Sequence, residues 1–304
     1  MPIELQQFQK SLIYETKAPI SNVIADLQAI ESLDKLAELQ QKKYGKQALY
    51  YFLLAVAAIG LIIVSLVVIV NATFLGTVII LLSLTSVGLI AACIYALIKR
   101  AKFGKLNVIN YRYELAKKVL QMMARDMNAT TEVEVRLSFQ EVRNKENKTE
   151  TINHPYKSGW KIDKYEHEWL KIRGQFLDKT RFALSATGIS KSQYGWKRSS
   201  SGKSKYKTKS KSLGLDILLH LTYPQRRYGA VKILQSDISN AVKLPKLSFM
   251  RGLNAGEKSI HMNVRVASQV EDNLEEVYQT ITMMFLSLYQ VLNLAKVLSK
   301  SAKI

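Results

Sequence analysis

A stretch of 52 consecutive residues, 47–98, contains no Asp, Glu, Lys or Arg. The connection 71–76 divides it into two apolar runs, 48–70 and 77–98. A helix of about 20 residues is long enough to cross the hydrocarbon core of a bilayer, and a helix satisfies all its backbone groups within one segment. Because the connection is short, the stretch predicts two antiparallel helices, a transmembrane hairpin over 47–98.

The charges that flank this hairpin predict its orientation. Basic residues lie outside both apolar runs, whereas the connection carries no charge. These basic residues are Lys42, Lys43, Lys46, Lys99, Arg100, Lys102 and Lys105. Since Lys and Arg accumulate in cytoplasmic flanks, we expect an integral membrane protein with both termini in the cytoplasm. Residues 1–10 are polar and lack the apolar core of a cleaved signal peptide, so the first run is expected to direct insertion.

The charge balance of the chain points to its partners. The formal net charge is +20, from 44 basic and 24 acidic residues. Such an excess favours anionic partners: phospholipid headgroups, nucleic acid or acidic protein surfaces. The single cysteine, Cys93, lies in the second apolar run, which excludes intrachain disulfides and Cys-based metal sites.

The N-terminal region, 1–46, predicts an amphipathic cytoplasmic helix over 19–45. Apolar residues recur there at spacings of three and four, as on one face of a helix. They are Ile20, Val23, Ile24, Leu27 and Ile30. Such a helix packs against the soluble domain or lies on the membrane surface. Its polar face mixes Asp and Glu with Lys, which favours packing.

Small residues repeat every four positions in the second predicted membrane helix, at Gly88, Ala92 and Ala96. A stripe of small residues lets helix backbones approach closely. It predicts a contact face with the first helix or with another copy of the chain. The alternative is the ordinary small-residue content of a membrane helix.

Two further amphipathic helices are predicted by seven-residue repeats. Residues 103–128 keep such a repeat within a juxtamembrane region, 99–130, and are expected to continue the second membrane helix as a stalk. The C-terminal region, 269–304, has four repeats between 272 and 300 that include Ile281 and Leu288. We expect the C-terminal helix to pack against the stalk.

Between these helices, residues 131–268 change to a period of two, which is typical of half-buried strands. The expected strands are 133–139, 169–176, 181–189, 215–223, 228–233, 247–250 and 259–266. Residues 144–158 are expected to form a loop, and 177–180 a turn. The predicted fold class is therefore an α+β membrane protein: a transmembrane hairpin, an amphipathic N-terminal helix, and a cytoplasmic antiparallel β domain flanked by long helices.

A basic loop at 191–212 stands apart from the rest of the β domain. Ten basic residues and no acidic one lie between Lys179 and Leu215, and lysines occupy every second position from Lys203 to Lys211. In an extended chain these lysines project from one side. One interpretation is that this row of lysines binds phosphates, on lipid headgroups or on nucleic acid. The alternative is that the loop is a solvated Lys/Ser insertion. The Arg226-Arg227 turn either extends this basic surface or simply connects two strands.

The residues expected to contact the anionic partner form one group. They are Trp196, Lys197, Arg198, Lys203, Lys205, Tyr206, Lys207, Lys209, Lys211, Arg226 and Arg227. The aromatic members Trp196 and Tyr206 suit insertion at a membrane interface or stacking on bases.

Catalytic signatures are not evident in this sequence. The four histidines have no metal-binding spacing, and no phosphate loop or nucleophile elbow is present. Glu166, His167 and Glu168 are adjacent, but neighbours in a strand point to opposite faces, so we interpret them as a solvated strand. No cofactor or metal is expected.

The sequence therefore favours a non-catalytic, membrane-anchored binding or scaffold module that uses its lysines to engage anionic lipid or an acidic protein partner. A membrane-tethered nucleic-acid-binding protein is the alternative, and an enzyme with an unrecognised site is the third. A homo-oligomer is compatible with each.

Overall fold

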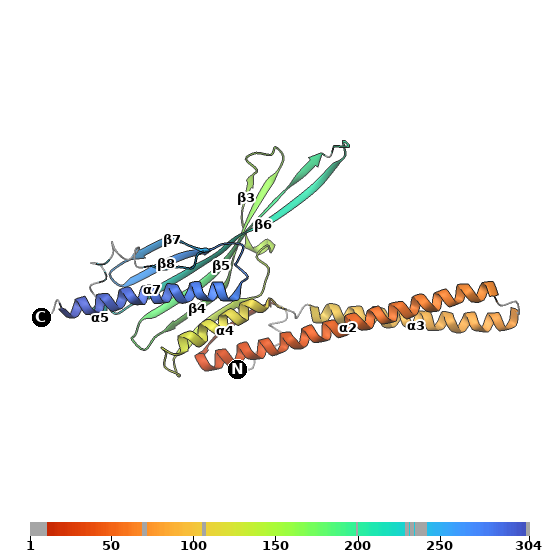
Figure 1. Ribbon diagram of the computed structural model, residues 1–304, viewed down its shortest axis with the longest axis horizontal. Helices are drawn as coiled ribbons and strands as arrows, with labels where there is room; N and C mark the ends of the chain where they lie inside the picture. Colours follow the sequence, from red (N-terminus) through yellow and green to blue (C-terminus); the bar gives the residue numbers. More distant parts are fainter. Residues whose placement is uncertain are drawn as a thin grey trace. The chain divides into compact units, whose positions relative to one another are not determined.

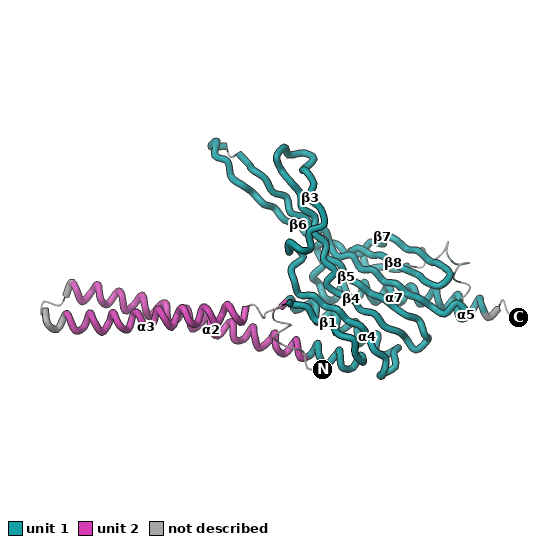
Figure 2. Tube along the Cα trace, turned by 180° about the vertical axis from the view of Figure 1, so that it is seen from behind, with its two compact units in different colours: residues 1–28, 109–304 teal, residues 29–108 magenta. Residues whose placement is uncertain are grey.

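A computed structural model of the chain (Figure 1) describes residues 11–68, 72–104, 108–198, 200–228, 231, 234 and 242–301. The chain divides into two compact units (Figure 2). The first, here called the sheet unit, comprises residues 1–28 and 109–304; the second, the helical unit, comprises residues 29–108. The polar segment 1–10 and Lys105, one of the basic residues that flank the predicted hairpin, lie outside the described residues.

In its described residues, the sheet unit is built on eight antiparallel strands. In spatial order the main path is β1-β2-β4-β5-β6-β8-β7, and β3 pairs with β4. The strands are β1 (Ile13–Pro19), β2 (Glu132–Ser138), β3 (Lys148–Asn153), β4 (Lys161–Gln175), β5 (Arg181–Arg198), β6 (Ser204–Thr222), β7 (Ser248–Ala255) and β8 (Ser259–Val266). Together with the helices, this antiparallel sheet confirms the α+β class.

One face of the sheet forms the core because apolar residues align across the strands. Leu184 in β5 lies opposite Leu219 in β6, which lies opposite Met262 in β8, and all three are fully buried. Helices α4 (Asn110–Ala124) and α7 (Leu274–Ser301) pack together and against this sheet (Figure 1). The expected packing of the C-terminal helix on the segment after the hairpin is therefore confirmed.

The apolar repeat of α7 explains why it lies on the sheet. Val277, Ile281, Met284 and Leu288 are fully buried, whereas Leu298 near the end of the helix is exposed. On α4 the buried side includes Tyr113, Leu120 and Met123, together with the charged Arg112. At the helix surface, Lys118 Nζ lies 3.1 Å from Glu275 Oε2.

Strands β4, β5 and β6 are longer than predicted. The expected strands covered 169–176, 181–189 and 215–223, and each real strand continues into polar sequence. With β3, these extensions project from the rest of the sheet unit (Figure 2). The predicted strands ended where the apolar alternation ends, but the backbone hydrogen bonds between the strands continue beyond that point.

Other local predictions were wrong. β1 was not anticipated, and the predicted loop 144–158 contains the 3-10 turn η1 (Lys145–Asn147) and strand β3. The expected strand 228–233 begins at Tyr228, which instead ends the short helix α5 (Gln225–Tyr228); 229, 230, 232 and 233 lie outside the described residues.

The helical unit contains most of α2 (Ile20–Val68) and α3 (Ala72–Gly104). The predicted amphipathic segment and first apolar run thus form one helix. α3 begins at Ala72, so most of the expected connection is helical, and Asn71 lies outside the described residues. Because Val108 and Ile109 are not helical, α3 does not continue into α4 as one stalk.

Small residues form the contact between α2 and α3, but not all on the predicted stripe. Ala48, Ala55 and Ser86 are buried, and Cys93 Sγ lies 3.4 Å from the Ala48 carbonyl oxygen. Of the predicted stripe, Ala96 is buried. Gly88 is exposed, and no atom lies within 4 Å of the position that a Cβ would take there. The predicted contact with the first helix is therefore present at Ala96 and not at Gly88, and contact of this stripe with another copy of the chain stays a prediction.

Candidate functional site

The basic loop forms the outer part of a regular β-hairpin, here called the lysine hairpin, residues 190–212. β5 and β6 pair to the tip, with Arg198 opposite Ser204. Lys197 lies opposite Lys205, and Lys191 lies opposite Lys211. Directly paired residues of an antiparallel ladder share one face. The extended conformation that the alternating lysines required is therefore present; Ser199 at the tip lies outside the described residues.

Six lysines share this face. Within each strand, alternate residues point to the same side, so the cross-strand register places both strands' lysines together. They are Lys191, Lys197, Lys205, Lys207, Lys209 and Lys211. In the described part of the chain none of the six forms a salt bridge, and all but the partly buried Lys191 are exposed.

The opposite face of the lysine hairpin carries aromatic residues. Trp196 lies opposite Tyr206, with ring centroids 5.6 Å apart and rings 75° to one another. Their exposed fractions are 66% and 54%. The predicted aromatic and basic residues are thus brought into one hairpin but divided between its two faces. A flat partner contacts only one of these sets at a time.

Asp163 of β4 anchors the base of this aromatic face. Its Oδ1 accepts hydrogen bonds from Thr151 Oγ1 at 2.7 Å and Tyr194 Oη at 3.2 Å, and lies 2.9 Å from Lys148 Nζ. Burial alone raises the pKa of the Asp163 carboxyl, but the bonds from Lys148 and Thr151 outweigh it and hold the pKa below its usual range. The carboxylate therefore joins β3, β4 and β5.

A tryptophan holds the lysine hairpin from the lysine side. Trp160, before β4, donates from Nε1 to the Trp196 carbonyl at 3.0 Å. Its ring covers Gly195, where a Cβ would lie 2.6 Å from the ring. Lys157 Nζ lies 4.6 Å from the centroid of the same ring. Glycine is favoured at 195 because any side chain there would force the indole to move.

The two predicted arginines lie elsewhere. Arg226 and Arg227 are exposed on α5, which follows the inner end of β6. β6 has 19 residues and, at about 3.3 Å per residue, spans roughly 60 Å. These arginines therefore do not extend the lysine surface at the far end of the strand, which leaves the alternative of a connection after β6; anion binding by Arg226 and Arg227 stays a prediction.

A polar cleft of about 440 Å³ lies at the base of the lysine hairpin. Arg112 and Trp169, both almost fully buried, lie side by side in its wall, with the guanidinium 5.2 Å from the ring centroid. Arg112 donates from one terminal nitrogen to the Ser138 and Gln140 carbonyls at 2.7 and 2.8 Å. Its Nε and the Trp169 Nε1 have no hydrogen-bond partner in the part of the chain that the structure describes. Glu271, whose pKa is raised by burial, closes the cleft beside Ser212.

His167 corrects the prediction of a solvated strand at 166–168. The side chain is buried, with Nε2 3.0 Å from Ser138 Oγ and Nδ1 3.1 Å from Asn147 Oδ1. Burial, and then the nearby charge of Arg112, lower the His167 pKa to about 4. The imidazole is therefore neutral near pH 7, in keeping with a structural hydrogen-bonding role.

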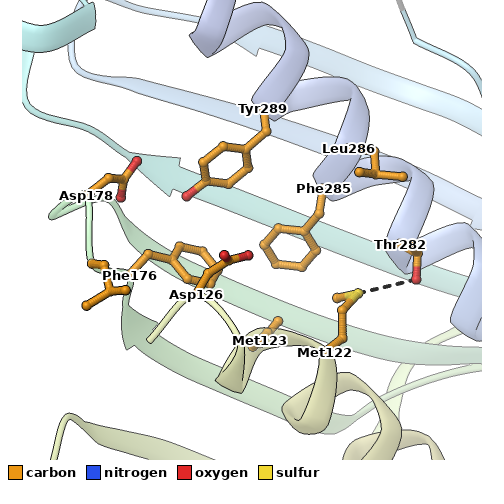
Figure 3. A pocket seen from close by; sticks show the side chains of 10 residues that line it. Met122, Met123, Asp126, Phe176, Asp178, Thr282, Phe285, Leu286 and Tyr289 are labelled. Carbon is orange, nitrogen blue, oxygen red and sulfur yellow. Dashed lines mark hydrogen bonds between the residues drawn. The ribbon is translucent and has the colours of Figure 1, made fainter. Parts of the chain in front are cut away.

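A second, apolar pocket of about 410 Å³ lies between α4, α7 and the β4–β5 turn (Figure 3). Its lining is mostly aromatic, methionine and leucine side chains, with two carboxylates at its edge. The residues are Met122, Met123, Asp126, Phe176, Leu177, Asp178, Thr282, Phe285, Leu286 and Tyr289. Among the described residues, no group of three or more His, Cys, Asp and Glu side chains is arranged to hold a metal ion.

Sequence reasoning missed both pockets. Arg112 precedes Tyr113 but is not a position of the apolar repeat of 103–128, so the local pattern did not indicate that its side chain is buried. Phe176, Phe285 and Tyr289 come from distant segments, and only the tertiary packing brings them together. Comparisons with protein-family models, with curated proteins and with solved structures find no match to this chain.

Proposed function

We propose that this chain is an integral membrane protein whose lysine hairpin binds anionic lipid headgroups. The observation that carries the proposal is the gathering of six lysines on one face of the hairpin, without a salt bridge among the described residues. Like charges directly opposite one another destabilise a sheet. Lys197 with Lys205 and Lys191 with Lys211 are such pairs, and an anionic surface relieves their repulsion.

Membrane anchoring is supported by the surface of the helical unit. Large apolar side chains that water would disfavour cover it. They include Leu49, Phe52, Leu53, Leu61, Ile63, Ile80, Leu81, Leu84 and Val87, each more than half exposed. Within the described ranges, three helices are long and apolar enough to cross a membrane: α2, α3 and α7. The apolar face of α7 is already buried against the sheet, so we assign the crossing to α2 and α3.

The proposed orientation puts the sheet unit and both termini in the cytoplasm. Lys42, Lys46, Lys99 and Arg100 lie at the ends of the apolar segments on the side of the sheet-unit connections, which the positive-inside rule assigns to the cytoplasm. The inner leaflet is rich in anionic lipid, and each Lys near it contributes on the order of 1 kcal/mol. We propose binding, not catalysis, as the role of the hairpin.

Lipid is favoured over nucleic acid by the division of the hairpin into two faces. A single-stranded nucleic acid uses phosphate contacts and base stacking together, but here the exposed Trp196 and Tyr206 point away from the lysines. A flat headgroup layer needs only the lysine face. Nucleic acid is therefore the competing outcome of the test.

The test uses full-length protein in phosphatidylcholine nanodiscs, mixed with sedimenting vesicles. We expect it to sediment with vesicles containing phosphatidylserine and not with pure phosphatidylcholine vesicles at about 0.15 M salt. Replacing five lysines by Gln should abolish this. The five are Lys203, Lys205, Lys207, Lys209 and Lys211.

A matched control removes five charges from the opposite end of the sheet. Its substitutions to Gln are at Lys179, Arg181, Arg226, Arg227 and Lys258, which are all exposed. This variant should sediment like wild type. Equal loss in both variants would show that only net charge matters, and retention of RNA in place of vesicles would transfer the assignment to nucleic acid.

A further inference from the structure

The apolar pocket lies at the C-terminal end of helix α4. Met122 and Met123 belong to its last turn, and the Asp126 amide donates to the Met123 carbonyl at 3.0 Å. A helix C-terminus carries roughly half a negative charge. The last turn of α4 contains no basic residue, and the basic C-cap residue that follows it, Arg125, is not among the residues that line the pocket. The pocket is therefore electrostatically negative at this end before any side chain is counted.

Two carboxylates add to this potential. Asp126 is exposed at the pocket edge, and its side chain has no hydrogen bond or salt bridge within the described part of the chain. Asp178 is fixed by Thr180, whose amide donates to Oδ1 at 2.8 Å, and by Tyr228 Oη, which donates to Oδ2 at 2.7 Å. None of the described residues that line the pocket is basic, in a chain whose net charge is +20. Burial and then Asp178 raise the pKa of Tyr289 above its usual range.

The wall of the pocket is aromatic. Phe176 stands nearly perpendicular to Tyr289 and to Phe285, with centroids 5.8 and 6.1 Å away. Figure 3 shows these rings beside Asp126 and Asp178, with Leu286 at the other end. Ring faces carry partial negative charge and attract cations. The volume, about 410 Å³, is within the range of small-molecule sites.

We infer that this pocket binds an organic cation: an ammonium group near Asp126 and Asp178, joined to an apolar body that contacts the rings and methionines. Carboxylates, a helix C-terminus and aromatic faces all favour a positive charge, whereas the apolar lining disfavours a hydrated inorganic ion. An anion of the same shape meets repulsion from each of these groups. The inference is independent of the lipid-binding proposal.

The probe is benzyltrimethylammonium, with benzyl alcohol and phenylacetate as uncharged and anionic counterparts. Full-length protein with ¹³C-methyl methionine is reconstituted in nanodiscs and titrated with each compound. Of eight methionines, those at 122 and 123 should shift with the cation. Met262, buried in β8, serves as an internal reference. We expect the cation to bind at least tenfold more tightly than either counterpart, a factor that corresponds to about 1.4 kcal/mol.

Two variants and one control, all at exposed positions that do not support the core, test the assignment. Asp126→Asn should weaken binding about fivefold or more, whereas Asp272→Asn, an exposed carboxylate of the separate polar cleft, should not. Leu286→Trp should fill the pocket and abolish the shifts. The inference is overturned if the three compounds bind equally, if the signals of Met122 and Met123 do not move, or if Asp126→Asn binds like wild type.

Discussion

Strands β5 and β6 are paired along their whole length, yet their two halves have different surroundings. In the inner half, 181–189 with 214–222, Leu184 and Leu219 are fully buried beneath the helices. In the outer half, 190–198 with 204–212, Lys207 and Lys209 are exposed to solvent. The backbone ladder is common to both, but only the inner half has an apolar core.

The difference shows that the backbone hydrogen bonds that form a strand and the apolar burial that stabilises it are separate contributions. A backbone hydrogen bond contributes only about 1 kcal/mol net, and an isolated hairpin is marginal in water. The outer half therefore depends on a few anchors, chiefly Trp160 against Gly195 and the Asp163 carboxylate. Because the lysine side chains of the outer half do not pack into a core, they form a charged surface.

The sharpest test of the comparison places the same charge in each half. Leu219→Asp buries a carboxylate without a partner in the core, so it should destabilise the sheet unit by about 4 kcal/mol or more. Thr208→Asp, on the exposed outer half, should change stability by less than about 0.5 kcal/mol. Thermal unfolding of the full chain in nanodiscs, followed by near-ultraviolet circular dichroism, measures both. Equal losses would show that the outer half is also packed.

The same division explains which strands the sequence predicted. β8 was predicted at Ser259–Val266 because its alternate residues are all buried under the helices. The predicted end of β5 at Ile189 marks the end of the apolar alternation, not of the strand. β1 and β3 lack a regular apolar alternation, so their pairing depends on neighbours that a local pattern cannot show.

The lysine surface could be predicted only in part. Alternation in 203–211 indicated a single lysine-bearing side, but the contribution of Lys191 and Lys197 depends on the β5–β6 register. That register includes an irregularity between Ile189 and Ser190, which no local pattern reveals. For Arg226 the prediction included a residue that does not belong to the lysine surface. Arg226 follows β6 in sequence, but β6 is long and its lysines lie toward the other end.

Between pH 7 and pH 4.5, acid should act on the inner region and not on the lysine hairpin, because the Asp163 carboxyl that anchors the hairpin has a pKa below its usual range and stays ionised there. The folded-state pKa of His167 is about 4, below the ordinary 6.5, so the unfolded chain gains a proton first as the pH falls. Stability should therefore be complete above pH 6.5 and decline toward pH 4, by on the order of 2 kcal/mol after allowance for solvent screening. Urea unfolding at pH 7 and pH 4.5 measures this.

His167→Gln should reduce that decline, because no imidazole remains to be protonated in the unfolded chain. His154→Gln, at a partly exposed position in the β3–β4 connection, serves as the matched control and should keep it. A decline of the same size in both variants would assign the acid sensitivity to other groups, and would contradict the contrast between the two regions.

The anchors of the outer half predict a smaller, local effect. Gly195→Ala places a methyl group 2.6 Å from the Trp160 ring, so the indole must move, at a cost of about 1–2 kcal/mol. Amide hydrogen exchange should accelerate in the lysine hairpin while the inner half of β5 remains protected. Gly202→Ala, at the hairpin tip, removes no such contact and tests strain alone, since its φ is +77°. Unchanged exchange in Gly195→Ala would show that Trp160 does not hold the hairpin.

The smallest expected effect concerns repulsion between lysines. Lys205 and Lys211 lie opposite Lys197 and Lys191, whereas Lys207 and Lys209 lie opposite Gly195 and Gln193. Each like-charged pair should destabilise the hairpin by a few tenths of a kcal/mol. Replacing Lys205 and Lys211 by Gln should therefore slow hydrogen exchange in the hairpin by about twofold at low salt. The same change at Lys207 and Lys209 should have less effect, although both variants lose two charges.

Because salt screens exposed charges, the difference between the two variants should shrink at about 0.5 M salt. If they remain equal at every salt concentration, the opposed lysines are not in repulsive contact, and their arrangement loses its value as evidence for an anionic partner.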